Sequence, residues 1–181
     1  MVNNLKLTGP KTLTSADSDT TLSYSLPAST ASGWCADYDE TCINTQQLYA
    51  SGDATLGTLY SWIVATAGQG TYSTTSGDVG SSICPKNWKL PTRNNTGSFQ
   101  GLADAYGYSA DVTGNPTNLF QRGYYIGSMG ETERGYYWSS TAQSDIGAYY
   151  MRIGSGNNIV CEGISCGNGK QAGFSVRCVN D

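Results

Sequence analysis

Six cysteines in a chain without histidine limit how these 181 residues can be held together. They are Cys35, Cys42, Cys84, Cys161, Cys166 and Cys178. No two of them form a Cys-x-x-Cys pair, and a zinc site with mixed ligands would need histidine. The pattern favours disulfides, with a thiolate metal site as the alternative. Because disulfides persist in oxidising compartments, we expect an extracellular location, at a cell surface or on a virion.

The composition is typical of a loop-rich globular domain. Only 38% of residues are hydrophobic, yet 11% are aromatic, with 13 Tyr, 4 Trp and 23 Gly. A disordered chain would carry more charge and fewer aromatic residues. The length suits one domain with a sizeable core.

The charge and the hydropathy pattern restrict the partners. The net charge is −4 and only 10 residues are basic, so nucleic acid is not an expected partner. No stretch approaches the roughly 20 apolar residues that span a bilayer, so we expect no membrane insertion of this domain. Met1 is followed by polar residues rather than a signal peptide, which predicts a trimmed leader or packaging into a particle. The sequence does not predict an oligomeric state.

Two regions differ in character at the N-terminal end. Residues 1–33 are polar, with a short alternating run at Leu22, Tyr24 and Leu26, and predict an arm with one or two edge strands. Residues 34–181 form the predicted main domain. Its first loop holds Cys35 and Cys42 among several carboxylates. These do not match the ligand spacing of a calcium loop, so a solvated loop closed by a Cys35–Cys42 disulfide is favoured.

Two segments carry the apolar periodicity of amphipathic helices. Thr55–Ala67 has an uninterrupted stripe, with Thr55 as cap and Gly68 as stop. The second segment begins after Ser98 and ends at Gly107, with Phe99, Leu102, Ala103 and Tyr106 on one face. We expect both helices to lie against the core.

The rest of the chain reads as short strands. The predicted strands are Leu119–Ile126, Tyr136–Ser139, Ala148–Ile153 and Phe174–Val179. Helices followed by a β-rich half predict an α+β fold with an antiparallel sheet. Trp138 is expected in the core, whereas Tyr124, Tyr125, Tyr136 and Tyr137 fit either the core or its surface.

Several blocks in a fixed order carry a family resemblance. They are Leu59-Tyr60-Ser61-Trp62, Ile83-Cys84-Pro85, Trp88-Lys89-Leu90-Pro91-Thr92, Tyr137-Trp138-Ser139-Ser140-Thr141-Ala142 and Gly173-Phe174-Ser175-Val176-Arg177-Cys178-Val179. With these blocks, residues 34–179 resemble the Fibrobacter succinogenes major paralogous domain family and the related Legionella collagen-like protein C-terminal domains.

The resemblance implies a C-type lectin fold, in the subgroup that includes formylglycine-generating enzymes. That fold implies two helices flanking a twisted antiparallel sheet, termini close together, and a long-range disulfide between Cys84 and Cys178. The chain lacks the copper-binding cysteine pattern of formylglycine generation. It also lacks the calcium motif of sugar-binding lectins, since Asn115-Pro116-Thr117-Asn118 has no carboxylate.

Several families with this fold are variable proteins of diversity-generating retroelements, which randomise Asn codons near the end of the gene. Residues 144–169 consist almost wholly of amino acids that such randomisation can reach, with Met151 and Glu162 as exceptions. The resemblance therefore implies a variable region over 144–172. The alternative is an ordinary loop with two strands, rich in Gly, Asn and Ser.

The leading hypothesis is a receptor- or adhesin-type domain that binds a protein or glycan on another cell surface. The variable face is expected to contain Asp145, Ile146, Tyr149, Arg152, Ile153, Gly154, Ile159, Cys161, Ile164, Ser165, Cys166 and Asn168. Tyr supplies contact area at small entropic cost, and Ser, Gly and Asn adapt to the partner. Some of the isoleucines fit the core equally well. Cys161 and Cys166 are expected to pair, or to remain free.

Three other functions are weighed against this one. A calcium-dependent lectin and an invariant module of a surface layer or pilus are alternatives. Catalysis is not expected, because Ser139 and Ser140 lack a histidine base and the Glu131/Glu133 pair fits a solvated surface. No cofactor and no metal are expected.

Overall fold

The computed structural model describes most of the chain after residue 57. The described residues are 5, 11–18, 24–26 and 58–180, without 72, 94–97, 108–110, 115–118, 120, 122–123, 126–128, 157–158 and 162–166. Their strands and helices are β1 (Lys11–Leu13), β2 (Tyr24–Leu26), β3 (Leu59–Tyr60), α2 (Trp62–Ala65), β4 (Gly77–Asp78), β5 (Trp88–Lys89), α3 (Phe99–Tyr106), β6 (Tyr124–Tyr125), β7 (Met129–Gly130), β8 (Gly135–Ala142), β9 (Gly147–Ile153), β10 (Ile159–Cys161), β11 (Gly167–Gly169), β12 (Phe174–Ser175) and β13 (Val179–Asn180). The fold class is α+β, as predicted.

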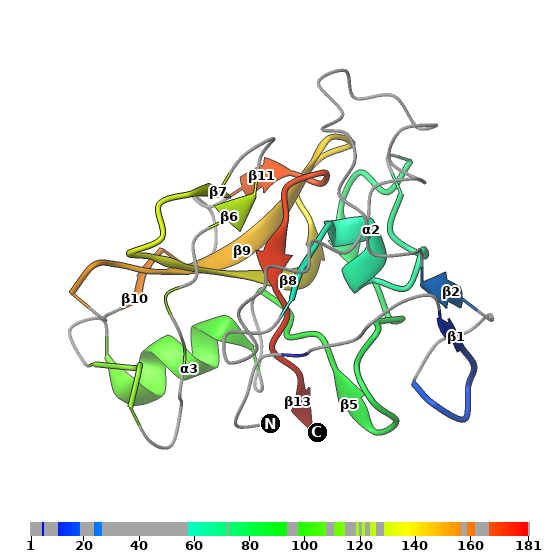
Figure 1. Cartoon of the computed structure of the whole chain (residues 1–181), viewed down its shortest axis with the longest axis horizontal. Helices are drawn as coiled ribbons and strands as arrows, with labels where there is room; N and C mark the ends of the chain where they lie inside the picture. Colours follow the sequence, from blue (N-terminus) through cyan, green and yellow to red (C-terminus); the bar gives the residue numbers. More distant parts are fainter. Residues whose placement is uncertain are drawn as a thin grey trace.

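The central sheet has the strand order β10-β9-β8-β12-β3, with β11 also paired to β9 and β4 to β8 (Figure 1). Strands β8 and β9 form its long antiparallel pair, in which Trp138 lies opposite Tyr150. Strand β12 runs parallel to β8, with Ser175 opposite Tyr137. The sheet is therefore mixed, and the expectation of a purely antiparallel sheet is wrong at this pair.

The two faces of the β8–β9 pair pack into two separate cores. Successive side chains of a strand point to opposite faces, so neighbouring residues enter different cores. Tyr136 and Trp138 belong to an aromatic core with Phe174, whereas Tyr137 belongs to a helix-side core. The members of the helix-side core are Phe99, Ala103, Val112, Leu119, Tyr137, Met151, Ile153 and Ile159.

The aromatic core is organised around Trp138, which is fully buried as predicted. Its ring lies 4.2 Å from that of Phe174, centroid to centroid. Its indole N–H donates to the backbone carbonyl of Tyr60 at 2.8 Å. The indole N–H of Trp62 donates to the backbone carbonyl of Ser139, also at 2.8 Å. Both indoles thus bury their apolar surface without losing a hydrogen bond.

Helix α3 closes the opposite face, and its predicted ends are confirmed. The Ser98 hydroxyl accepts from the backbone N–H of Gly101 at 3.1 Å, and Gly107 ends the helix with a φ of 73°. Phe99 and Ala103 point into the helix-side core. Local capping chemistry and one apolar stripe therefore define this element.

Within the part that the structure describes, the other predicted helix, Thr55–Ala67, is confirmed only over Trp62–Ala65. Leu59 and Tyr60 form strand β3, paired with β12, and helix α2 begins only at Trp62 after the cap Ser61. Every residue of α2 is buried, so no exposed face distinguishes helix from strand here. The expected cap Thr55 lies outside the described residues.

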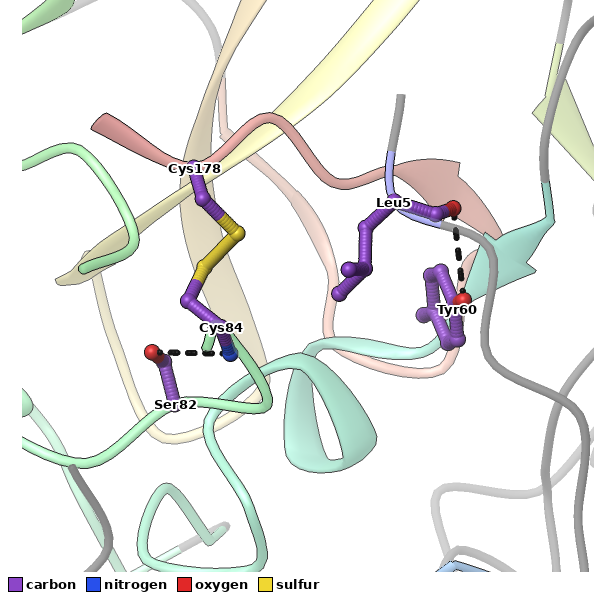
Figure 2. The surroundings of a disulfide bond; sticks show 5 residues. All are labelled: Leu5, Tyr60, Ser82, Cys84 and Cys178. Carbon is purple, nitrogen blue, oxygen red and sulfur yellow. Dashed lines mark hydrogen bonds between the residues drawn. A yellow bond between two sulfur atoms is a disulfide. The ribbon is translucent and has the colours of Figure 1, made fainter. Parts of the chain in front are cut away.

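A disulfide joins Cys84 to Cys178, as the resemblance implies (Figure 2). Both sulfur atoms are buried, and the bond closes a separation of 94 residues. Near it, the N–H of Leu5 donates to the carbonyl of Val176 at 2.9 Å, and the Tyr60 hydroxyl donates to the carbonyl of Leu5. Residues close to both ends of the chain thus lie together beside the aromatic core.

The N-terminal arm contributes a two-stranded sheet of β1 and β2, separate from the central sheet. The strand expected near Leu22–Leu26 is present as β2. Leu5 and Leu13 are buried in the aromatic core, so this part of the arm packs against the main domain.

Candidate functional site

Among the predicted face residues whose exposure the structure describes, the two most exposed lie in the turn between β8 and β9. Asp145 is exposed, and Ile146 is 43% exposed. Hydrogen bonds from the backbone N–H groups of Gln143 and Ser144 to the carbonyl of Gly147 hold the turn. These two side chains therefore reach solvent from an ordered turn.

Three predicted face residues belong instead to the interior. Ile153 and Ile159 are fully buried in the helix-side core, and Gly154 is buried beside them. The Gly154 carbonyl accepts from the side-chain amide of Gln121 at 2.6 Å. Their assignment to an exposed face is wrong, because β9 and β10 pack Ile153 and Ile159 with the residues around α3.

Strands β10 and β11 both pair with β9, and residues 162–166 join them. Cys161 lies opposite Arg152, and Gly167 lies opposite Tyr149. Asn168 lies on β11. The predicted residues Ile164, Ser165 and Cys166, like Cys35 and Cys42, lie outside the described residues. The described residues on either side of 162–166 therefore both pair with β9.

Tyr149 lies on the same side of the sheet as the helix-side core and is partly exposed. The guanidinium of Arg93 lies over its ring, 4.2 Å from the ring centroid. The backbone N–H of Arg93 donates to the Thr141 hydroxyl at 2.9 Å. This cation–π contact ties a predicted face residue to the segment before α3.

The opposite side of the sheet carries a cluster that we call the tyrosine–arginine surface, formed by Tyr124, Glu131, Tyr150 and Arg152. Its tyrosines cover the edge of the aromatic core. The Tyr124 ring lies 5.1 Å from that of Tyr136, and the Tyr150 ring lies 4.9 Å from that of Phe174. Tyr124, Tyr150 and Arg152 are partly exposed, and Glu131 is exposed. The cluster thus has a buried base and a solvent-facing side.

Electrostatics link the members of this surface. Burial raises the pKa of the Tyr150 hydroxyl, Arg152 lowers it, and Glu131 and Tyr124 raise it. The hydroxyl therefore keeps its proton at neutral pH and can donate a hydrogen bond. Arg152, Glu131 and Tyr124 thus all lie within electrostatic range of the Tyr150 hydroxyl.

The glycine of the β6–β7 hairpin allows Tyr124 to reach its position. A Cβ at Gly130 would lie 2.7 Å from the Cζ of Tyr124, which is closer than Cβ atoms come to other heavy atoms in proteins. Glu131 follows with a positive φ of 44°, unusual for a residue other than glycine. Its side chain accepts from the Tyr136 hydroxyl and pairs with Arg134 at 2.7 Å. The turn therefore fixes Tyr124 and Glu131 together.

Lys170 is a fully buried cation beneath the β8–β9 turn. Its ammonium donates to the carbonyls of Thr71 and Thr74 at 2.8 and 2.7 Å, and lies 4.8 Å from the Trp62 ring centroid. Burial lowers the pKa of Lys170 to about 8, and the Asp145 carboxylate opposes this shift. Its backbone N–H donates to the carbonyl of Ile146 at 2.9 Å. Lys170 thus connects the turn to the loop after α2.

Five of these residues lie outside the predicted face: Arg93, Tyr124, Glu131, Tyr150 and Lys170. From the sequence, Tyr124 fits either the core or its surface, and Glu131 fits a solvated carboxylate pair. Arg93 carries no signal in the sequence, because its contact with Tyr149 joins residues 56 positions apart along the chain. Successive residues of a strand point to opposite faces, so the adjacent Tyr149 and Tyr150 indicate in the sequence that β9 presents a tyrosine on each side of the sheet.

Within the described residues, no group of three or more His, Cys, Asp or Glu side chains is placed to hold a metal ion. Among those residues there is also no helix long and apolar enough to cross a membrane.

Comparison with models of known protein families, with curated proteins and with solved structures gives no match for this chain. The resemblance to the Fibrobacter and Legionella domains depends on the sequence blocks alone and stays a prediction.

Proposed function

We propose that this chain is a ligand-binding domain with a C-type lectin fold, displayed on the surface of a cell or a virion. Its contact surface is formed by β9, by the turn before it and by the segment that follows it up to residue 169. Residues within 144–172 are diversified by a retroelement. The ligand is a protein or a glycan on another surface.

One observation carries the proposal: strand β9 combines buried residues with partly exposed ones, and the two alternate from Tyr150 to Ile153. Ala148, Met151 and Ile153 are fully buried, whereas Tyr150 and Arg152 remain partly exposed. A strand fixed by its buried residues can hold its exposed side chains in one geometry. Such preorganisation lowers the entropic cost of binding.

The Cys84–Cys178 disulfide supports the same proposal. It joins the segment after α2 to the end of the chain, and so brackets β8, β9 and the proposed variable region. Crosslinking at the borders restrains the framework while the enclosed segment changes sequence. A disulfide also agrees with display in an oxidising environment.

The diversified nature of the region is tested in the coding DNA. The expected result is a near-copy of the codons for 144–179 near the gene, with mismatches confined to adenines, beside a reverse-transcriptase gene. A neighbourhood without such a repeat would contradict diversification.

Binding by this region is tested with a display library varied at Asp145, Ile146, Tyr149 and Arg152. Panels of cell-surface proteins and glycans should select different library members while the parent fold is retained. Selection that never depends on these four positions would contradict the proposed contact surface. A chelator separates the calcium-dependent lectin from this proposal, because it would lower the melting temperature of such a lectin.

A further inference from the structure

Arg152 has an incompletely satisfied guanidinium. Its Nε is buried and has no hydrogen-bond partner within the described part of the chain. A guanidinium offers five N–H donors in a planar fork and accepts none. A charged donor without a partner is destabilising, so its retention calls for a physical explanation.

The nearby carboxylate is already engaged. Glu131 pairs with Arg134 at 2.7 Å and accepts from the Tyr136 hydroxyl. The charge of Glu131 is thus balanced by Arg134, which leaves the positive charge of Arg152 uncompensated on this surface. The cluster therefore attracts an anion despite the net charge of −4 of the chain.

The neighbours of Arg152 suit a specific contact rather than diffuse attraction. Tyr150 lies two residues before it on the same side of β9, and its hydroxyl is protonated and able to donate. Tyr124 covers the aromatic core beside it. Rings fixed from below lose little entropy on binding, and a planar fork fits the two oxygens of a carboxylate.

We propose that the tyrosine–arginine surface is a subsite for the carboxylate of an Asp or Glu side chain on a protein partner. This inference rests on the proposed function and specifies the chemistry of its contact surface. The protein source is favoured over an acidic sugar because tyrosine and arginine together are the composition of protein-binding hot spots. The carboxylate pairs with the two terminal Nη groups of Arg152, since the buried Nε is out of its reach, and Tyr150 donates to it.

Arg93 provides a matched control. Its Nε is also buried without a partner, and it also lies beside a tyrosine of β9. Its guanidinium, however, lies over the face of the Tyr149 ring, on the opposite side of the sheet. Loss of Arg93 removes a similar charge without touching the proposed subsite.

The test is an NMR titration of protein labelled with ¹⁵N-arginine, which reports each Nε–H separately. The probes are N-acetyl-glutamate N-methylamide, its neutral glutamine counterpart, and the methyl glycoside of N-acetylneuraminate. We expect a saturating shift of the Arg152 Nε–H with the glutamate derivative and none with the glutamine derivative. Followed by backbone amide shifts of β9, which do not need the arginine signal, Arg152→Lys should weaken binding roughly tenfold, since it keeps the charge but loses the fork. Arg93→Gln should bind like the parent.

Three results would overturn the inference: no saturation with the glutamate derivative, equal binding of its glutamine counterpart, or tighter binding of the sialoside. Backbone amide spectra of each variant check that the fold is intact. The proposed function is tested separately, by the coding DNA and by the display library. If those succeed while the titration fails, the domain binds ligands without a carboxylate subsite.

Discussion

The turn before β9 and the far end of the same strand differ in their physical surroundings. Ile146 is 43% exposed in a turn held by backbone hydrogen bonds, whereas Ile153 is 0% exposed in the helix-side core. Both isoleucines were predicted to belong to one contact face. Buried framework residues and exposed face residues are therefore interleaved within this segment. A partner can therefore contact only the side chains that the two cores leave free.

The largest expected effect comes from removing the covalent part of the framework. Replacing Cys84 and Cys178 together by Ala should lower the free energy of unfolding by about 4–5 kcal/mol, because the bond closes a long loop. Denaturant unfolding of the variant against the parent measures this loss. A loss below about 1 kcal/mol would show that the two cores hold the framework without the disulfide.

Ile153→Ala should lower the free energy of unfolding by about 3 kcal/mol, since it leaves a cavity between β9 and α3. The conservative variant Ile153→Val should cost about 1 kcal/mol. Urea unfolding of both variants measures the difference. Equal, small losses would mean that the strand end is not tightly packed, and the contrast with Ile146 would disappear.

Lys170 connects the turn before β9 to the loop after α2, and its contribution to stability should depend on pH. Its pKa is about 8 in the folded chain and near 10.5 in the unfolded chain. Between these values the unfolded chain binds more protons, so this group makes stability rise as pH increases from about 8 toward 10. Below pH 8 the ammonium is charged in both states, so Lys170 no longer makes the free energy of unfolding depend on pH.

The neutral amine retains two hydrogens for the carbonyls of Thr71 and Thr74, so deprotonation need not break the hydrogen bonds. Lys170→Met should remove this rise of the free energy of unfolding with pH, while the pH dependence that comes from other groups stays. Unfolding of parent and variant at pH 7, 8, 9 and 10 measures the difference between them. A difference that stays constant over this range would refute the assigned titration.

The smallest effect is expected at the turn. Ile146→Ser should change the free energy of unfolding by no more than about 0.5 kcal/mol, because the side chain has little packing to lose. Thermal unfolding of this variant, beside Ile153→Ser as the buried counterpart, makes the comparison direct. A loss of several kcal/mol for Ile146→Ser would place the turn within the framework.

Local signals in the sequence were sufficient for some elements. Helix α3 was predicted with both ends because Ser98 and Gly107 act through contacts within one turn. Trp138 was predicted in the core and lies there. The Cys84–Cys178 pair came from the family resemblance rather than from any local signal.

Other features depend on pairing between distant segments. The apolar stripe of Thr55–Ala67 predicted one helix, but β3 pairs with β12, more than 100 residues later in the chain. A segment buried on all sides has no polar face to set its period, so periodicity could not distinguish strand from helix. The placement of Ile153 and Arg152 on opposite sides of β9 likewise depends on which elements cover each side.

Two displayed libraries sorted for protease resistance test whether a fixed framework presents a replaceable set of side chains. One is randomised at Asp145, Ile146, Tyr149 and Arg152, and the other at Ile153 and Ile159. We predict that most members of the first library resist proteolysis like the parent, whereas survivors of the second keep apolar side chains at both positions. Similar survival in the two libraries, or unfolding of most members of the first, would show that the framework does not hold these four positions free to change.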